Sequence, residues 1–213
     1  ENADSPLDPD IDTTENLTNL VTLIREKRVA DIVFNSANHG SSSALSGSDR
    51  WDDYAGSDPI GDVRAARAAV HLASGKMPNT MVVGLQVHLK LLDHPDILER
   101  IKYTQRGVIT EDLLAQLFEV DNYFVGRALY DSSNEGASES LGYVWGKSVA
   151  LIYAEPSPGL RKVSYGYQFQ SQGFRVSKWR EESIRSDWVE VGETRDEHII
   201  SEDCGYLYAT VIS

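Results

Sequence analysis

Cysteine is almost absent from the sequence, which limits how the fold can be stabilised. Cys204 is the only cysteine among 213 residues, so an internal disulfide and a metal site built from several thiolates are both excluded. A reducing, cytosolic compartment fits this composition. A chain of this length buries roughly 70% of its unfolded surface on folding, so a hydrophobic core is possible without such crosslinks.

Long apolar runs and basic stripes are also missing. No stretch of about 18 consecutive apolar residues occurs, so we expect no membrane-spanning helix and no membrane partner. The formal net charge is −13, with the acidic excess in residues 1–15 and 181–203. Because no cluster of Lys and Arg is available to neutralise phosphates, we expect no specific nucleic-acid recognition. The chain begins at Glu1 rather than Met, so the natural protein is expected to extend further N-terminally.

Catalytic, cofactor-binding and metal-binding motifs are absent as well. Gly146-Lys147-Ser148 resembles the end of a phosphate-binding loop, but position 141 is Leu instead of Gly and a strand is expected to follow. His88 and His94 are six residues apart across a helix break, so they do not form the i, i+4 pair of a metal site, and we expect a surface pair. We therefore assign no catalytic, cofactor-binding or metal-binding residue, and expect neither a cofactor nor enzyme activity.

The clearest pattern that is present is strand, three helices, strand. Residues 80–83 and 123–125 are short apolar runs next to glycine, which is typical of buried strands. The first helix is indicated by the helical spacing of Leu85, Leu89 and Leu92. A second helix is expected to begin near Pro95 and to end at Gly107, and Thr110 is expected to cap a third.

A long amphipathic helix is expected from Asp12 to about Val33. Asp12 and Glu15 form a capping-box pattern, and the acidic residues 1–11 are expected to be an extended lead-in. One face of the helix comprises Leu17, Leu20, Val21, Ile24 and Arg28; the other carries Glu15, Arg25, Glu26, Lys27 and Asp31. The charged face is either solvated or the side along which a neighbouring subunit docks.

The rest of the chain is expected to consist of loops, one further helix and several strands. Residues 35–59 are expected to form a long loop anchored by Trp51 and Tyr54, and residues 131–140 a polar, mobile tip. The other expected elements are a helix at 60–73, strands at 143–153, 188–191 and 206–212, and a hairpin of Tyr165–Phe169 and Phe174–Trp179 that turns at Ser171-Gln172-Gly173.

Several of these segments together carry a resemblance to a known family. They are REKRVADIVF on the long helix, SDPIGD, MPNTMVVG, LLDHPDILERIKYTQRGVITEDLLAQLF, VGRALY, YVWGKSVALIY and WREESIRSDWVEV. In their order and spacing, which cover nearly the whole chain, they resemble the major capsid proteins of tailed bacteriophages, which have the Hong Kong 97-like fold. The resemblance implies a structural protein that assembles into the icosahedral head around phage DNA.

The resemblance also implies an α+β fold with a long spine helix. We expect an extended lead-in at 1–11, the spine helix and loop of a peripheral domain at 12–59, an α/β axial domain at 60–160, and the β-strands of the peripheral domain at 161–213. Family members have an N-terminal arm and an extended loop before the spine helix; no such segments are found here, so we expect residues 1–213 to fold without building shells.

The partners and contacts implied by the resemblance are those of a coat protein. Copies of the chain would contact one another in capsomers, with scaffold, protease or portal proteins as further partners, in a virion made in the bacterial host cytoplasm. The subunit-contact candidates are Arg25, Glu26 and Arg28 on the spine helix, and Asn134 and Glu135 in the polar tip.

Two alternatives remain open from the sequence. An encapsulin-like nanocompartment shell shares the fold and would differ in its gene neighbourhood. A small α/β enzyme would instead use loop carboxylates, and it would require a deep pocket lined by Asp52, Asp53 and a histidine.

Overall fold

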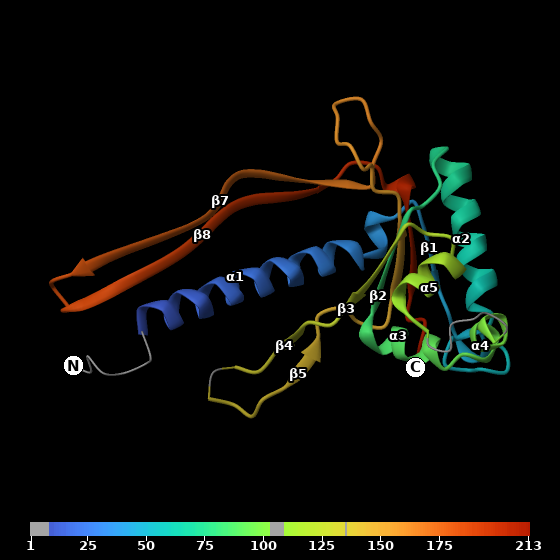
Figure 1. Cartoon of the computed structure of the whole chain (residues 1–213), viewed down its shortest axis with the longest axis horizontal. Helices are drawn as coiled ribbons and strands as arrows, with labels where there is room; N and C mark the ends of the chain where they lie inside the picture. Colours follow the sequence, from blue (N-terminus) through green and yellow to red (C-terminus); the bar gives the residue numbers. More distant parts are fainter. Residues whose placement is uncertain (1–8, 103–108, 135) are drawn as a thin grey trace.

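The computed structural model describes residues 9–102, 109–134 and 136–213, and these form a layered body with two projecting hairpins (Figure 1). The body contains a five-stranded sheet in the order β1-β9-β6-β2-β3. Its strands are β1 (Ser41–Ala44), β2 (Thr80–Gly84), β3 (Asn122–Gly126), β6 (Val149–Ile152) and β9 (Gly205–Ala209). The β1–β9 and β2–β3 pairs are parallel, and β6 runs antiparallel to both of its neighbours.

Four helices cover one face of the sheet. They are α2 (Pro59–Ser74), α3 (Leu85–Leu92), α4 (Pro95–Ile101) and α5 (Glu111–Leu117). The α2 helix begins at an Asp58 cap followed by Pro59 and ends at Gly75, whose φ of 70° is a left-handed conformation that glycine adopts without strain. Met81 and Val83 point into this helical layer, whereas Val82 points to the opposite face, as expected for alternating strand residues.

The opposite face of the sheet receives the end of α1 (Pro9–Val33), the longest helix of the described chain. Most of α1 projects beyond the body, with the hairpin of β7 (Gly166–Glu181) and β8 (Ser186–Ile199) beside it (Figure 1). A shorter hairpin, β4 (Leu129–Asp131) and β5 (Leu141–Tyr143), projects on the other side of α1 (Figure 1). The described residues also include three short 3-10 helices: η1 (Ser36–Asn38), η2 (Gly47–Asp49) and η3 (Glu202–Cys204).

The body confirms most of the local predictions. Both expected strands are present as β2 and β3, a helix begins at Pro95, and the Thr110 side chain accepts a hydrogen bond from the Leu113 backbone N–H at the start of α5. Trp51 is fully buried and anchors the 35–59 loop as predicted. Tyr54, the second predicted anchor, is 38% exposed and only meets the His94 ring edge-on. The predicted helix end at Gly107 lies outside the described residues.

The long helix departs from its prediction at both the start and the apolar face. It begins at Pro9, so the predicted extended lead-in through Ile11 is too long, and Asp12 lies inside the helix instead of capping it. The predicted apolar stripe is largely exposed, with Leu20 at 47% and Ile24 at 64% of full exposure. The reason is that α1 leaves the body over most of its length, and only its last turns, at Ala30 and Val33, reach the core.

The structure corrects three of the strand predictions. The predicted turn at Ser171-Gln172-Gly173 lies within β7, where the pairing register shifts between Gln170 and Arg175. The hairpin turns instead between Glu181 and Ser186, with Arg185 in a left-handed conformation at φ 51°. The predicted strand 143–153 is split into β5 and β6, and β9 ends at Ala209.

Burial corrects two further assignments. The predicted surface histidine pair is buried: His88 lies against the Tyr123 hydroxyl, with 3.1 Å between Nδ1 and the oxygen, and His94 is 0% exposed at the start of α4. The inner face of α3 is formed by Val87, His88 and Leu91, since Leu89 points outward. The sheet also crosses the predicted domain boundaries, because β1 and β9 lie outside residues 60–160.

Candidate subunit-contact surfaces

Two opposite faces of α1 hold the two hairpins. Consecutive residues in an α-helix differ by about 100° around its axis, so Arg25 and Glu26 point to different sides. Arg25 and Arg28 face β8, whereas Glu26 and Lys27 face the β4–β5 side. Three of the predicted contact candidates are therefore engaged within the chain.

On the first face, two ion pairs join α1 to β8. Arg25 Nη1 lies 3.5 Å from Glu193 Oε2, and Arg28 Nε lies 2.7 Å from Glu197 Oε2. The hydrogen bond to Glu197 raises the pKa of Arg28 above its ordinary value, so this residue is a permanent cation. The Glu193 side chain is only 7% exposed, and burying a carboxylate is costly unless cationic groups pair with it.

An aromatic ring strengthens the same contact. Arg195 Nε lies 2.7 Å from Glu193 Oε2. The guanidinium carbons of Arg195 and Arg25 lie 5.7 Å and 6.0 Å from the centroid of the Phe174 ring, within the range of cation–π attraction. Near the N-terminal end of α1, Lys178 forms an ion pair with Asp10. The hairpin is thus fastened to α1 at several points along its length.

On the second face, α1 holds the β4–β5 hairpin. The Trp145 indole N–H donates to Glu26 Oε1 at 2.7 Å, and Lys27 Nζ lies 5.4 Å from the centroid of the Tyr130 ring. Lys27 also pairs with Asp31 one turn further along the helix. The charged face predicted to be either solvated or a docking rail is therefore partly occupied by this chain's own hairpin.

The polar tip predicted at 131–140 is the loop that joins β4 to β5. The Asp131 carboxylate accepts hydrogen bonds from the backbone N–H groups of Ser133 and Ser140, both at 2.9 Å, and these lower its pKa. Asn134 is exposed, and its carbonyl accepts from the Ala137 N–H at 3.0 Å. Glu135 lies outside the described residues. The mobility of this tip stays a prediction.

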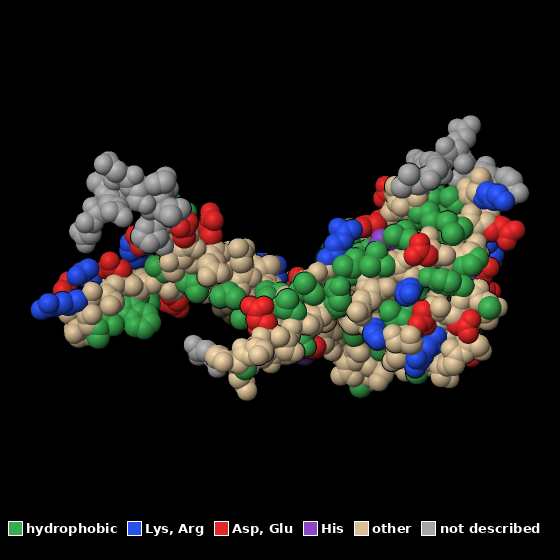
Figure 2. Space-filling view, turned by 90° about the horizontal axis from the view of Figure 1, so that it is seen from below, with side chains coloured by type: hydrophobic (Ala, Val, Ile, Leu, Met, Phe, Trp, Pro, Cys, Tyr) green, Lys and Arg blue, Asp and Glu red, His purple; other side chains and the backbone are tan. Residues whose placement is uncertain are grey.

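Both hairpins expose apolar side chains. On β7–β8, Trp179 and Trp188 stack across the strands with centroids 6.2 Å apart and remain 44% and 49% exposed. On β4–β5, the exposed apolar residues are Leu129, Leu141 and Tyr143. Figure 2 shows hydrophobic side chains on the surface of the projecting part and at its junction with the body. Apolar side chains that gather on one exposed surface are candidates for an interaction surface.

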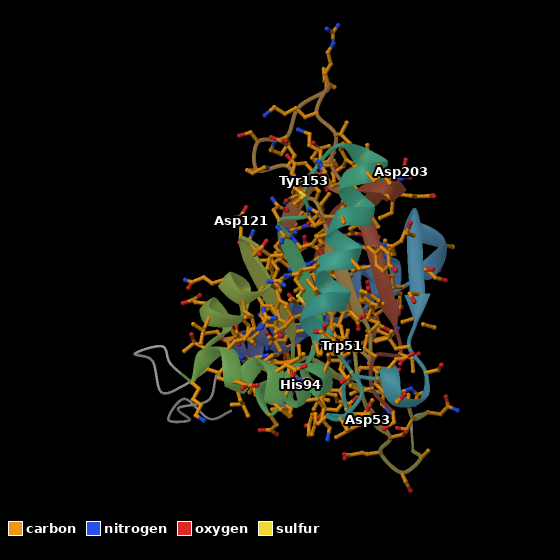
Figure 3. All side chains as sticks on the ribbon, turned by 90° about the vertical axis from the view of Figure 1, so that its right-hand side faces the viewer. Trp51, Asp53, His94, Asp121, Tyr153 and Asp203 are labelled. Atoms are coloured by element: carbon orange, nitrogen blue, oxygen red, sulfur yellow. The ribbon has the colours of Figure 1, made fainter. Side chains whose placement is uncertain are left out.

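The loop carboxylates weighed for an enzyme have structural partners. Asp52 accepts hydrogen bonds from the backbone N–H of Ser213, at 3.1 Å, and from its hydroxyl, and these lower the pKa of Asp52. Asp53 accepts from the Ala55 N–H at 3.2 Å. Figure 3 shows His94 and Trp51 within the body and Asp53 at its edge. His94 Nε2 lies 3.0 Å from the Ser57 hydroxyl, and burial lowers the pKa of His94.

Metal-ligand clusters and membrane spans are both missing from residues 9–102, 109–134 and 136–213. No group of three or more His, Cys, Asp or Glu side chains in these ranges is arranged to hold a metal ion. None of the helices in the same ranges combines the length and apolar character needed to cross a membrane.

The sequence is similar to that of phage coat proteins. Residues 36–163 match the family model described as Phage major capsid protein E. The major capsid protein of Burkholderia phage BcepMu is 31% identical over 204 residues, which covers 92% of this chain and 65% of that protein. The major capsid protein of Pseudomonas phage JBD67 is 30% identical over 222 residues, covering 100% of this chain and 70% of that protein. The chain thus spans about two thirds of the length of these curated relatives.

Solved structures agree with this similarity. A phage-related protein from Bordetella bronchiseptica superposes with a TM-score of 0.81 at 28% identity, covering 98% of this chain and 71% of that one. A protein assigned as the capsid protein of an Escherichia coli CFT073 prophage gives a TM-score of 0.58 at 12% identity, covering 96% and 71%. At this lower identity the likeness concerns the fold alone, and it agrees with the predicted α+β capsid fold.

Proposed function

Since the chain belongs to the Phage major capsid protein E family, we propose that it is a coat subunit that assembles with copies of itself into the icosahedral head around phage DNA. The observation that carries this proposal is the projecting α1 helix with a hairpin on each side, both exposing apolar residues. The long β7–β8 hairpin extends far beyond the body, and both hairpins are suited to reach neighbouring copies (Figure 1). Members of this family are structural proteins and not enzymes.

The proposal extends to the setting of the shell. The subunit would be made in the cytoplasm of a bacterial host and end in the virion, with scaffold, protease or portal proteins as partners during assembly. The encapsulin-like alternative predicts the same fold, and it is the less supported one because the curated relatives described above are phage major capsid proteins.

Negative-stain microscopy and light scattering coupled to size exclusion test the proposal. The natural gene product that contains residues 1–213 is expected to form closed particles of megadalton mass, whereas residues 1–213 alone are expected to give a monomer or small oligomer. Association costs several kcal/mol of translational and rotational free energy per subunit, which the contacts between copies must exceed. A natural product that stays monomeric across salt and protein concentrations would contradict the proposal.

A further inference from the structure

Trp145 stands at the root of the β4–β5 hairpin and is held from three directions. Its indole N–H donates to Glu26 on α1, and its ring meets the Phe34 ring edge-on, with centroids 5.4 Å apart and planes at 84°. Its third neighbour is Gly126 at the end of β3, where a Cβ would lie 2.0 Å from Trp145 Cγ. Only glycine allows the ring to lie this close to the strand.

The hairpin and Trp145 are continuous. Val144 N–H donates to Ala128 O at 2.9 Å, which extends the β4–β5 ladder to the residue next to Trp145. A change in the position of Trp145 therefore moves the root of the hairpin, and a short two-stranded hairpin has little stability of its own to resist such a change.

The two faces of this hairpin are different. Tyr130 points to the α1 side, where it contacts Lys27. Leu129 and Tyr143 are directly paired, and Leu141 lies on the same face, since strand side chains alternate. These three side chains are exposed. The orientation of the root thus decides where an apolar surface is presented.

Glu26 is placed to fix that orientation. It lies one turn before Ala30, which is 1% exposed in the cluster that contains Trp145, and two turns before Phe34. Apolar packing against Phe34 and Gly126 is not directional. A hydrogen bond to a carboxylate is directional and is stronger than a bond between neutral groups.

We propose that Glu26 is a positioning residue: by accepting the Trp145 N–H, it fixes the angle between α1 and the β4–β5 hairpin and so directs the hairpin's apolar face toward a second copy of the chain. The part that concerns a second copy rests on the proposed function. The orientation of the hairpin within a single chain does not, so the two parts can be tested separately.

The test measures a distance between α1 and the strands of the hairpin in the isolated chain. Spin labels are attached to Asn19→Cys on α1 and Leu141→Cys on β5, both exposed positions and both outside the tip that is predicted to be mobile, while Cys204 is buried and is expected to stay unlabelled. Electron–electron double resonance then gives the distribution of distances. Glu26→Ala removes the acceptor, Glu26→Gln keeps an acceptor oxygen, and Trp145→Phe keeps a ring but removes the donor. Glu15→Ala, an exposed glutamate on the same helix, is the matched control.

We expect Glu26→Ala and Trp145→Phe to broaden the distance distribution about twofold, because the hairpin then samples several orientations. Glu26→Gln and Glu15→Ala are expected to keep the wild-type width. A wild-type distribution in both Glu26→Ala and Trp145→Phe, or equal broadening in Glu15→Ala, would overturn the proposal.

The same substitutions in the natural gene product test the consequence for assembly. Glu26→Ala is expected to give fewer or irregular particles, and Glu26→Gln to restore them. Particles of wild-type yield and shape from Glu26→Ala would refute the role in directing the contact. If the wild-type product itself forms no particles, the proposed function fails, whereas the distance measurement still decides the role of Glu26 within the chain.

Discussion

Reversal of two charges on α1 separates a contact within the chain from a contact between copies. In Arg25→Glu/Arg28→Glu, both ion pairs to β8 are lost, and like charges face each other at Glu193 and Glu197. Partly exposed pairs contribute about 0.2–1 kcal/mol each, and like-charge pairs cost a similar amount. Because Arg28 is 48% exposed, solvent screens its pair. We therefore expect the free energy that holds the β7–β8 hairpin against α1 to fall by about 1 to 3 kcal/mol in the double variant.

Hydrogen exchange of the isolated chain is the appropriate assay. A detached two-stranded hairpin is marginally stable in water, so amides in β7 and β8 should exchange roughly five- to 150-fold faster in the variant, which is the same 1 to 3 kcal/mol expressed as a ratio of rates. The body should exchange as in the wild type. Arg64→Glu/Lys90→Glu, which makes the same change in net charge at exposed positions of the body, should leave the hairpin unchanged.

A charge swap then completes this experiment. Arg28→Glu/Glu197→Arg restores an ion pair with reversed polarity and should recover part of the lost protection. Wild-type exchange in the isolated charge-reversal variant, together with failure of the natural product to form particles, would refute the reasoning from the structure. The arginines would then act between subunits, as the sequence alone suggested.

Three further predictions concern the body and the tip. Gly126→Ala should destabilise the chain by about 3 kcal/mol or more in urea denaturation, because the new methyl group would overlap the Trp145 ring; a change below about 1 kcal/mol would show that the ring moves aside freely. Stability should also fall as pH drops below the unfolded histidine pKa of 6.5, since burial lowers the pKa of three histidines in the folded chain and the unfolded chain then binds more protons. Those histidines are His39, His88 and His94. Thermal melts that are flat between pH 7 and 5 would contradict this. Finally, amides at 132–139 should exchange rapidly in the isolated chain, and strong protection there would contradict a mobile tip.

Local signals in the sequence predict the body well. Helix boundaries are set by chemistry that operates within a few residues. Two helices start where a fixed φ or a side-chain cap favours it, at Pro95 and Thr110, and one ends at the left-handed Gly75. The apolar run at residues 80–83 predicts a strand that is buried on both faces. In these places the local preference and the tertiary contacts point to the same structure.

The projecting part could not be predicted in this way. Gly173 suggested a turn, yet it lies in an irregular stretch of β7. The actual turn contains Arg185 in a left-handed conformation, and arginine is not a residue type that predicts such a turn. The apolar residues of α1 suggested a core-facing stripe, but the helix leaves the core. Glu26 and Trp145 are 119 residues apart, and no spacing rule connects two side chains so distant in sequence.

The contacts on α1 also change what a subunit-contact residue means in this fold. A surface that must be ordered during association adds its ordering cost to the loss of translational and rotational freedom. The side chains of Arg25, Arg28 and Glu26 point toward hairpins of the same chain. Because these contacts form when the chain folds, the hairpins are ordered before two copies meet. The exposed residues of the hairpins can then meet a neighbour with their directions already set. If the proposal is right, a residue on α1 controls assembly without contacting another copy.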